Sequence, residues 1–243
     1  MASSQRILMI ISNPATSPVT GWPVGFWWAE LTHALEVFEG AGLEVTIASP
    51  EGGDLRGDAL SDPEDESGYS KEDAISRRFK NDPDRMKRLE GTPSLADVNP
   101  DDHDAIFVVG GQGPMVTMAD DEAVHRFVAD FYESGKITAA VCHGTCVLLK
   151  ARTSDGELIV KGRRWTGFAD AEEEYAENAV GRKIQPFWIE TEAGKLTGTE
   201  FVTGGLFEPF AVRDGTLITG QQQASSGRAA EEVVAALAER GRA

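Results

Sequence analysis

The stretch AAVCHGTCVLLK, residues 139–150, decides the fold. It opens with an apolar run typical of a buried strand and continues, past Cys142, His143 and Gly144, into a run typical of a helix. A nucleophile on a tight strand-to-helix turn is exposed above the sheet, and the helix amino end favours the reactive thiolate. Gly144 gives the turn room. The stretch therefore predicts an α/β fold with Cys142 as nucleophile and His143 as a nearby base, the alternative being a structural cysteine beside a surface histidine.

Strand-like and helix-like segments alternate on both sides of this turn. Helices are expected at residues 25–42 and 121–135, and short apolar runs predict strands at residues 6–12, 43–50, 105–111 and 137–142. This order predicts a parallel sheet with helices on both faces and a site at the carboxyl ends of the strands. Near the end of the chain, Asp214–Gly215 predicts a hairpin, and a final helix over residues 225–240 is expected to be N-capped by Ser225 or Ser226.

The charge of the chain excludes some partners. Its 243 residues include 23 Lys and Arg against 40 Asp and Glu, a formal net charge of −17, so its surface repels nucleic acid and anionic membranes. The opening apolar run, residues 7–11, is too short for a signal-peptide core or a membrane span, which favours the cytoplasm. Two cysteines argue against a disulfide scaffold, and the four histidines lack zinc-site spacing, so no metal is expected.

Residues 51–101 differ from the rest of the chain. They are polar, rich in Gly, Pro and Asp, and too long for an ordinary connection between two elements. Short helices are expected within them at residues 71–79 and 82–90. We interpret the segment as a cap insertion over the strand ends, and the alternative is a disordered acidic loop.

Glu30 lies on the apolar stripe of the first predicted helix, which is formed by Trp27, Ala34, Val37 and Ala41. A carboxyl group on such a stripe is expected to be buried and to stay protonated. Because this helix follows the first strand, Glu30 can lie near the strand ends and donate a hydrogen bond to the thiolate of Cys142. The alternative is a slightly rotated helix with Glu30 at its rim.

Two further segments offer groups to the same edge of the sheet. Glu172, Glu173 and Glu174 open a helix, where acids suit the helix dipole, and one of them could also orient His143. The turn VVGGQGPM, residues 108–115, lacks the lysine of a phosphate loop. It is better interpreted as a strand-end turn that offers backbone N–H groups to an oxyanion.

With these features in place, the chain resembles the ThiJ/PfpI superfamily, which shares the fold of class I glutamine amidotransferase domains. It is most similar to the heat-shock-chaperone branch, the glyoxalase III group. The likeness covers nearly the whole chain, residues 1–243, and is carried by TGFWWAELTHALEVFEGAGLEVTIASPEGG, DHDAIFVVGGQG, AAVCHGTCVLL, WTGFADAEEE, IQPFWIE and DGTLITGQQQASS. The resemblance implies a single flavodoxin-like domain, a cofactor-free lyase and a homodimer.

The resemblance also implies roles for individual residues. Cys142 becomes the nucleophile, His143 the proton-transfer residue and Glu30 the buried acid beside the thiol. Glu173, five residues after Phe168, best matches the acid that supports the histidine. The N–H groups of Gly111 and His143 would bind the oxyanion.

The sequence departs from the branch at several positions near the site. Gln112 replaces a histidine, Thr145 replaces the proline after CHG, and Gln222 and Gln223 replace Asn and Pro. These changes leave the nucleophile intact. The residues expected to contact the substrate are Gly110, Gly111, Gln112, Trp27 and Thr145.

Two classes of function follow. The first is a lyase in which Cys142 attacks a small electrophile, most simply a 2-oxoaldehyde such as methylglyoxal, and releases a 2-hydroxy acid. The same parts would serve isocyanide hydration or a specialised pathway lyase. The second is a stress chaperone or redox sensor with little turnover, which would need an exposed apolar patch.

Overall fold

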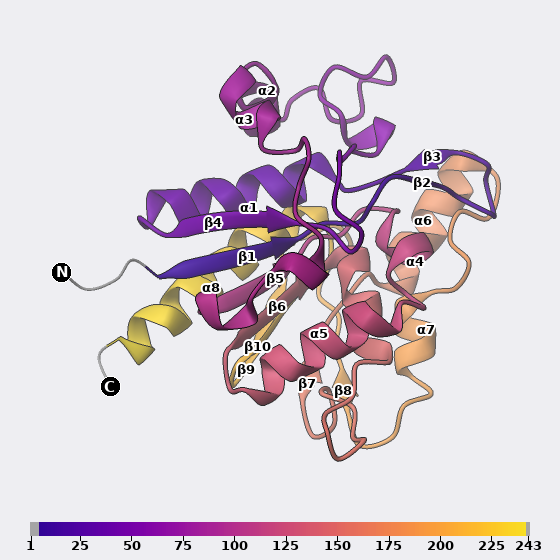
Figure 1. The fold of residues 1–243 in the computed structure, drawn as a ribbon. Helices are drawn as coiled ribbons and strands as arrows, with labels where there is room; N and C mark the ends of the chain where they lie inside the picture. The colour runs from indigo at the N-terminus through magenta and orange to yellow at the C-terminus, as the bar shows by residue number, and fades with distance from the viewer. Residues whose placement is uncertain (1–4, 242–243) are drawn as a thin grey trace.

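A six-stranded sheet forms the centre of the computed structural model, which describes residues 5–241 (Figure 1). Its order is β4-β1-β5-β6-β10-β9, with bounds Glu44–Ala48, Arg6–Ile10, Ala105–Val108, Ile137–Val141, Leu217–Gly220 and Ala211–Asp214. The first five strands run parallel, and β9 pairs antiparallel with β10 across a turn at Gly215 and Thr216. The predicted parallel-rich sheet and the hairpin are confirmed.

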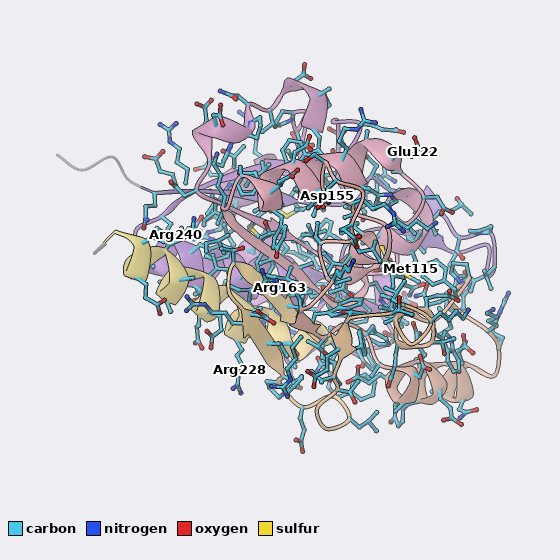
Figure 2. The ribbon with its side chains drawn as sticks, turned by 90° about the horizontal axis from the view of Figure 1, so that it is seen from below. Met115, Glu122, Asp155, Arg163, Arg228 and Arg240 are labelled. Carbon is cyan, nitrogen blue, oxygen red and sulfur yellow. The ribbon has the colours of Figure 1, made fainter. Side chains whose placement is uncertain are left out.

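Helices cover both faces of this sheet. One face carries α1 (Trp28–Gly40) and α8 (Ser226–Arg240), and the other carries α5 (Glu122–Glu133). Seen from below, Glu122 of α5 and Arg228 of α8 lie on opposite sides of the sheet (Figure 2). Burial on both faces explains why strands such as β1 and β5 are continuously apolar rather than alternating.

Shorter elements gather where the parallel strands end. They are β2 (Ala15–Thr16), β3 (Pro23–Val24), β7 (Arg164–Trp165), β8 (Glu200–Phe201), α4 (Pro114–Thr117), α6 (Asp170–Val180), α7 (Ile189–Ala193) and the 3₁₀ turn η5 (Gln223–Ser225). In Figure 1, α4, α6 and α7 lie at the same end of the sheet. The glutamate cluster does open a helix, α6, as predicted.

The segment 51–101 alternates short helices with turns and irregular chain. It holds η1 (Ala59–Ser61), α2 (Ala74–Lys80), α3 (Pro83–Lys87), η2 (Leu95–Asp97) and η3 (Pro100–Asp102). The two short helices predicted there, α2 and α3, are confirmed and lie above α1 in Figure 1. The hydroxyls of Thr32 on α1 and Ser76 on α2 are 2.8 Å apart, so polar contacts fix α2 on α1.

The helix predicted after the cysteine turn is confirmed, and it is a 3₁₀ helix, η4 (Cys142–Leu149). The N-cap prediction for α8 is confirmed in position only. Ser225 occupies the N-cap of α8, but neither serine caps it through its side chain. The Ser225 hydroxyl accepts the Phe210 N–H at 3.1 Å, and the Ser226 hydroxyl donates to the Glu30 carbonyl at 2.6 Å. Both serine hydroxyls therefore form hydrogen bonds with distant parts of the chain instead of capping α8. Within residues 5–241, no helix has the length and apolar character needed to cross a membrane.

Candidate active site

The site begins at the turn between β6 and η4. Cys142 has a φ of 53°, in the left-handed region that non-glycine residues rarely occupy. Such a conformation costs of order 1–3 kcal/mol and persists only where the surrounding structure imposes it. The chain is packed tightly here: at Gly144, two residues after Cys142, a Cβ atom would lie 2.8 Å from the Val108 carbonyl oxygen. The strained turn aims Cys142 at the strand ends, as the sequence predicts.

Cys142, His143 and Glu173 form a connected line of side chains. The Cys142 Sγ lies 3.6 Å from His143 Nδ1, and His143 Nε2 lies 2.9 Å from Glu173 Oε1. The Phe168 ring stacks on the imidazole with centroids 4.2 Å apart. Neighbours on a regular strand would point to opposite faces, and the left-handed turn at Cys142 is what brings the two side chains together. Glu173 is thus the member of the glutamate cluster that contacts His143.

Glu30 is fully buried on α1 and lies against the thiol. Its Oε2 accepts the Gly110 N–H at 2.8 Å, and the carboxyl group lies beside the Cys142 side chain. Its Oε1 has no nitrogen or oxygen partner among residues 5–241, which suits a protonated carboxyl group. Burial raises the pKa of Glu30 to about 8, from an ordinary value of 4.5. The structure therefore places Glu30 in the interior, and the rim alternative is excluded.

The expected fall in the pKa of the Cys142 thiol is wrong. Burial raises that pKa well above its usual range, and a charged Glu30 beside the sulfur raises it further. Backbone N–H groups of His143 and Gly111 act in the opposite direction. A thiolate is therefore best tolerated here when Glu30 keeps its proton, because two adjacent buried negative charges repel.

The glycine turn after β5 supplies one of these N–H groups. Gly111 has a φ of 106°, which a glycine adopts without strain, and a Cβ atom there would lie 2.5 Å from the Trp27 nitrogen. The N–H groups of Gly111 and His143 converge on the sulfur of Cys142. An oxygen that forms next to this sulfur can be bound by the same donors.

Two residues expected to contact substrate lie behind the turn instead. The Gly110 N–H is occupied by Glu30, and a Cβ atom at Gly110 would lie 2.8 Å from the Cys142 Cβ. Thr145 is buried, and its hydroxyl donates to the Cys142 carbonyl at 2.6 Å. Neither residue lines the pocket above the thiol, so both support the turn.

Sequence reasoning missed Asp58, which lies in the segment 51–101. Its Oδ1 accepts the Gly25 N–H at 2.8 Å, and its Oδ2 accepts the Gln112 N–H at 2.6 Å. Burial raises the pKa of Asp58 to about 7. This carboxyl group ties the chain before α1 to the turn that holds Gly111. No local pattern marks it, because both of its partners are distant in sequence.

A pocket of about 240 Å³ opens above Cys142 and His143. Trp27 and Gln112 line it, as predicted, and so does Gln223, whereas Gln222 is buried and its side-chain amide donates to the Glu208 carbonyl. The other lining residues are mostly apolar or aromatic and come from several loops and α6: Leu60, Tyr69, Phe168, Glu173, Tyr175, Ala176, Ala179, Val180, Ile184, Gln185 and Phe207. Cys142 therefore faces an apolar chamber.

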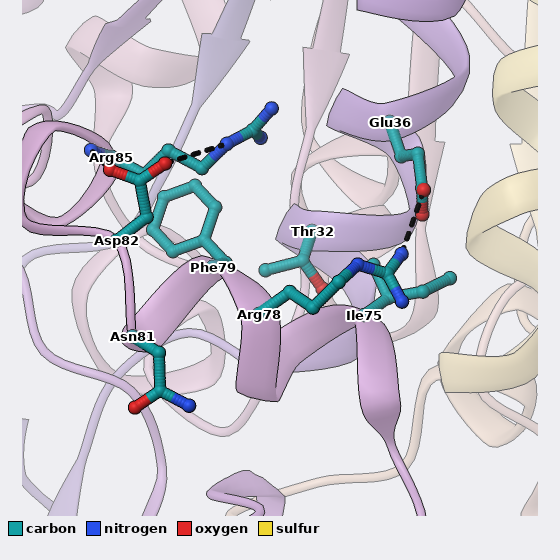
Figure 3. Close-up of a pocket in the computed structure, with 8 residues that line it drawn as sticks. All are labelled: Thr32, Glu36, Ile75, Arg78, Phe79, Asn81, Asp82 and Arg85. Atoms are coloured by element: carbon teal, nitrogen blue, oxygen red, sulfur yellow. Dashed lines mark hydrogen bonds and ion pairs between the residues drawn. The ribbon is translucent and has the colours of Figure 1, made fainter.

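Away from Cys142, charged side chains line a second hollow of the molecule. This hollow between α1, α2 and α3 is lined by charged groups that are paired with each other, Arg78 with Glu36 and Arg85 with Asp82 (Figure 3). In the part of the chain that the structure describes, no group of three or more His, Cys, Asp or Glu side chains is arranged to hold a metal ion.

The parallel sheet and the cysteine turn at the end of β6 define an α/β protein of the ThiJ/PfpI type. Comparison with known families agrees, because the model of the DJ-1/PfpI family matches residues 25–236. The chain belongs to this family.

Individual relatives cover almost the whole chain. "Glyoxalase 3" of Candida albicans is 27% identical over 95% of this chain and 97% of that protein. The crystal structure of a protein designated APC35852 is 37% identical, with a TM-score of 0.81, and the match covers 98% of this chain and 100% of that one. The crystal structure of glyoxalase III from Candida albicans is 23% identical, with a TM-score of 0.78, and covers 96% of this chain and 97% of that one. The last of these likenesses concerns the fold alone.

Proposed function

We propose that this protein is a cofactor-free, glutathione-independent glyoxalase that converts a 2-oxoaldehyde and water into a 2-hydroxy acid. The observation that carries the proposal is the buried Cys142 flanked on one side by the His143–Glu173 pair and on the other by Glu30. Relatives named as glutathione-independent glyoxalases in Candida albicans and Saccharomyces cerevisiae support it.

The reaction begins when the sulfur of Cys142 attacks the aldehyde carbon, C1. The S–C1 bond forms, the carbonyl electron pair moves to oxygen, and the oxygen faces the N–H groups of Gly111 and His143. The proton lost by the thiol passes to His143, whose imidazolium is stabilised by Glu173 at 2.9 Å. Protonation of the oxygen then gives a hemithioacetal.

The second stage moves a proton from C1 to C2. His143, close to the sulfur, removes the C1 proton, the C1–H electron pair forms the C1–C2 double bond, and the C2 carbonyl pair moves to its oxygen, which gives an enediolate. The proton returns to C2, the C1 hydroxyl proton passes to the C2 oxygen, and C1 becomes the carbonyl of a thioester. C1 is oxidised and C2 is reduced by the same two electrons, so no external oxidant is required. Water then attacks the thioester, the C1–S bond breaks, and the 2-hydroxy acid leaves. Glu30, protonated, can share its proton with the departing thiolate.

We also propose that residues 51–101 cap the site within a single domain. Leu60 and Tyr69 of this segment line the pocket, and Asp58 holds the Gly111 turn through Gln112. A cytoplasmic location suits a free catalytic thiol, since that compartment keeps thiols reduced. The homodimer implied by the family resemblance remains part of the proposal.

Turnover of methylglyoxal without glutathione tests the function. Wild type is expected to form the 2-hydroxy acid, and Cys142→Ser is expected to lose this activity because a hydroxyl is a far weaker nucleophile here. Cys146→Ser is the matched control: that thiol is buried one turn further on and contacts the Pro114 carbonyl, so activity should persist. If wild type turned over no 2-oxoaldehyde, the chaperone or redox-sensor alternative would replace this proposal. Full activity in Cys142→Ser would show instead that Cys142 is not the nucleophile.

A further inference from the structure

The pocket above Cys142 is larger than a three-carbon oxoaldehyde requires. Its volume is about 240 Å³, which at ~30 Å³ per water corresponds to roughly eight water molecules. Methylglyoxal has about five non-hydrogen atoms, each occupying no more than about one such share. A substrate of that size would therefore leave a third or more of the chamber to water, against walls that are mostly apolar.

Helix α6 shows the direction in which the chamber extends. Glu173, Ala176 and Val180 all line the pocket, at spacings of three and four residues, so they share one face of the helix. At ~1.5 Å per residue, this face runs roughly 10 Å from Glu173 to Val180. Its first member contacts the catalytic His143, and the following ones are apolar. The reacting carbonyls thus belong at one end and an apolar tail at the other.

The mouth of the chamber is also apolar. Among residues 5–241, four large hydrophobic side chains are exposed: Tyr69 (58%), Tyr175 (57%), Leu206 (49%) and Val180 (39%). Three of them line the pocket, and Leu206 adjoins the lining residue Phe207. Tyr175 also packs edge-on against Phe207, with centroids 5.3 Å apart. Apolar groups exposed together around a pocket indicate contact with an apolar ligand.

Charge excludes an acidic tail. The residues that line the pocket include no Lys or Arg within the described part of the chain, and they do include Glu173. A carboxylate or phosphate on the substrate would lose its water without gaining a cationic partner. The overall charge of −17 would also repel it during encounter. The tail must therefore be neutral.

We propose that the preferred substrates are uncharged 2-oxoaldehydes with a bulky apolar substituent, either aryl or branched alkyl. The two carbonyls lie at Cys142, and the substituent lies along Ala176 and Val180 toward the aromatic mouth. This inference rests on the proposed glyoxalase function. It adds no new step, because each substrate still combines with one water to give its 2-hydroxy acid.

The test is a homologous series measured as kcat/KM: methylglyoxal, longer and branched alkyl 2-oxoaldehydes, and phenylglyoxal. In a hydrophobic pocket one added methylene changes discrimination by about 10- to 200-fold, so kcat/KM should rise at least ~10-fold from methyl to isobutyl or phenyl. Ala176→Phe fills the chamber just beyond Glu173. It should lower the phenylglyoxal-to-methylglyoxal ratio of kcat/KM at least ~10-fold. Ala235→Phe, exposed on α8 and outside the pocket, is the matched control and should keep the wild-type ratio.

Val180→Asp provides a second test at an exposed position, where folding is not at risk. It places a charge beside the tail and should also lower the ratio. Equal or falling kcat/KM along the series, or an unchanged ratio in folded Ala176→Phe and Val180→Asp, would overturn this inference and leave the glyoxalase function standing. Absence of turnover with every member of the series would overturn both.

Discussion

Replacing Glu30 by Gln should make the protein more stable at neutral and basic pH. The pKa of Glu30 is about 8 in the folded protein and 4.5 ordinarily. Between these values the folded state holds the proton more tightly than the unfolded state, so the free energy of unfolding falls as pH rises. At about 1.4 kcal/mol per pKa step, the loss reaches at most about 5 kcal/mol by pH 8 and is absent below pH 4.5. Gln cannot ionise, and its shape preserves the contact with Gly110.

The measurement is urea unfolding of both proteins at several values between pH 4.5 and 8. The difference in unfolding free energy, variant minus wild type, should grow with pH in favour of Glu30→Gln. Asp58 is present in both proteins, so its own raised pKa cancels to first order. Glu36→Gln, on the same helix but with a side chain 51% exposed and paired with Arg78, is the surface control, and the pH-dependent difference for Glu30→Gln should clearly exceed the difference for Glu36→Gln. A flat difference for Glu30→Gln would refute the protonated, buried carboxyl group.

Three further predictions concern the chemistry. Iodoacetamide followed by peptide mapping should label Cys142, which lines the pocket, ahead of Cys146, which is buried against Pro114; dominant label on Cys146 would contradict the assignment of the nucleophile. Glu173→Gln should lower kcat at least about a hundredfold with little change in KM, because the imidazolium of His143 loses its charged partner, and steady-state kinetics would show whether KM changes instead. Asp58→Asn should lower kcat about tenfold, while thermal unfolding shows a folded protein. The reason is that the new amide NH₂ group would face a backbone N–H that a carboxylate oxygen now accepts. Unaltered kinetics would remove Asp58 from the site.

The parts that the sequence predicts well are those with local causes. Strands buried on both faces must be apolar throughout, so β1, β5 and β6 could be located within a few residues. Helical periodicity alone placed Glu30 on the buried face of α1. The Asp-Gly pair marked the hairpin because only certain residues adopt the turn conformation that joins β9 to β10.

The remaining features depend on contacts between distant segments. The predicted direction of the shift in the pKa of the Cys142 thiol was wrong. The depth of burial at Cys142 raises this pKa, and the burial is set by the elements packed around it, which a local pattern does not show. Thr145 is buried and its hydroxyl donates to the Cys142 carbonyl, a contact that the expected substrate-binding role did not foresee. The pocket above Cys142 is lined by side chains as far apart in sequence as Tyr69 and Phe207, so no single motif could reveal it.

Asp58 connects the segment 51–101, which we propose as a cap, to the residues around Cys142. Its two carboxylate oxygens hold Gly25, just before the helix that carries Glu30, and Gln112, just after the Gly111 N–H. A displacement of Asp58 would therefore move the buried acid and the oxyanion donor relative to each other. Two residues later in the same segment, Leu60 reaches the pocket wall. One short stretch of backbone therefore carries contacts both to the pocket wall and to the groups around Cys142.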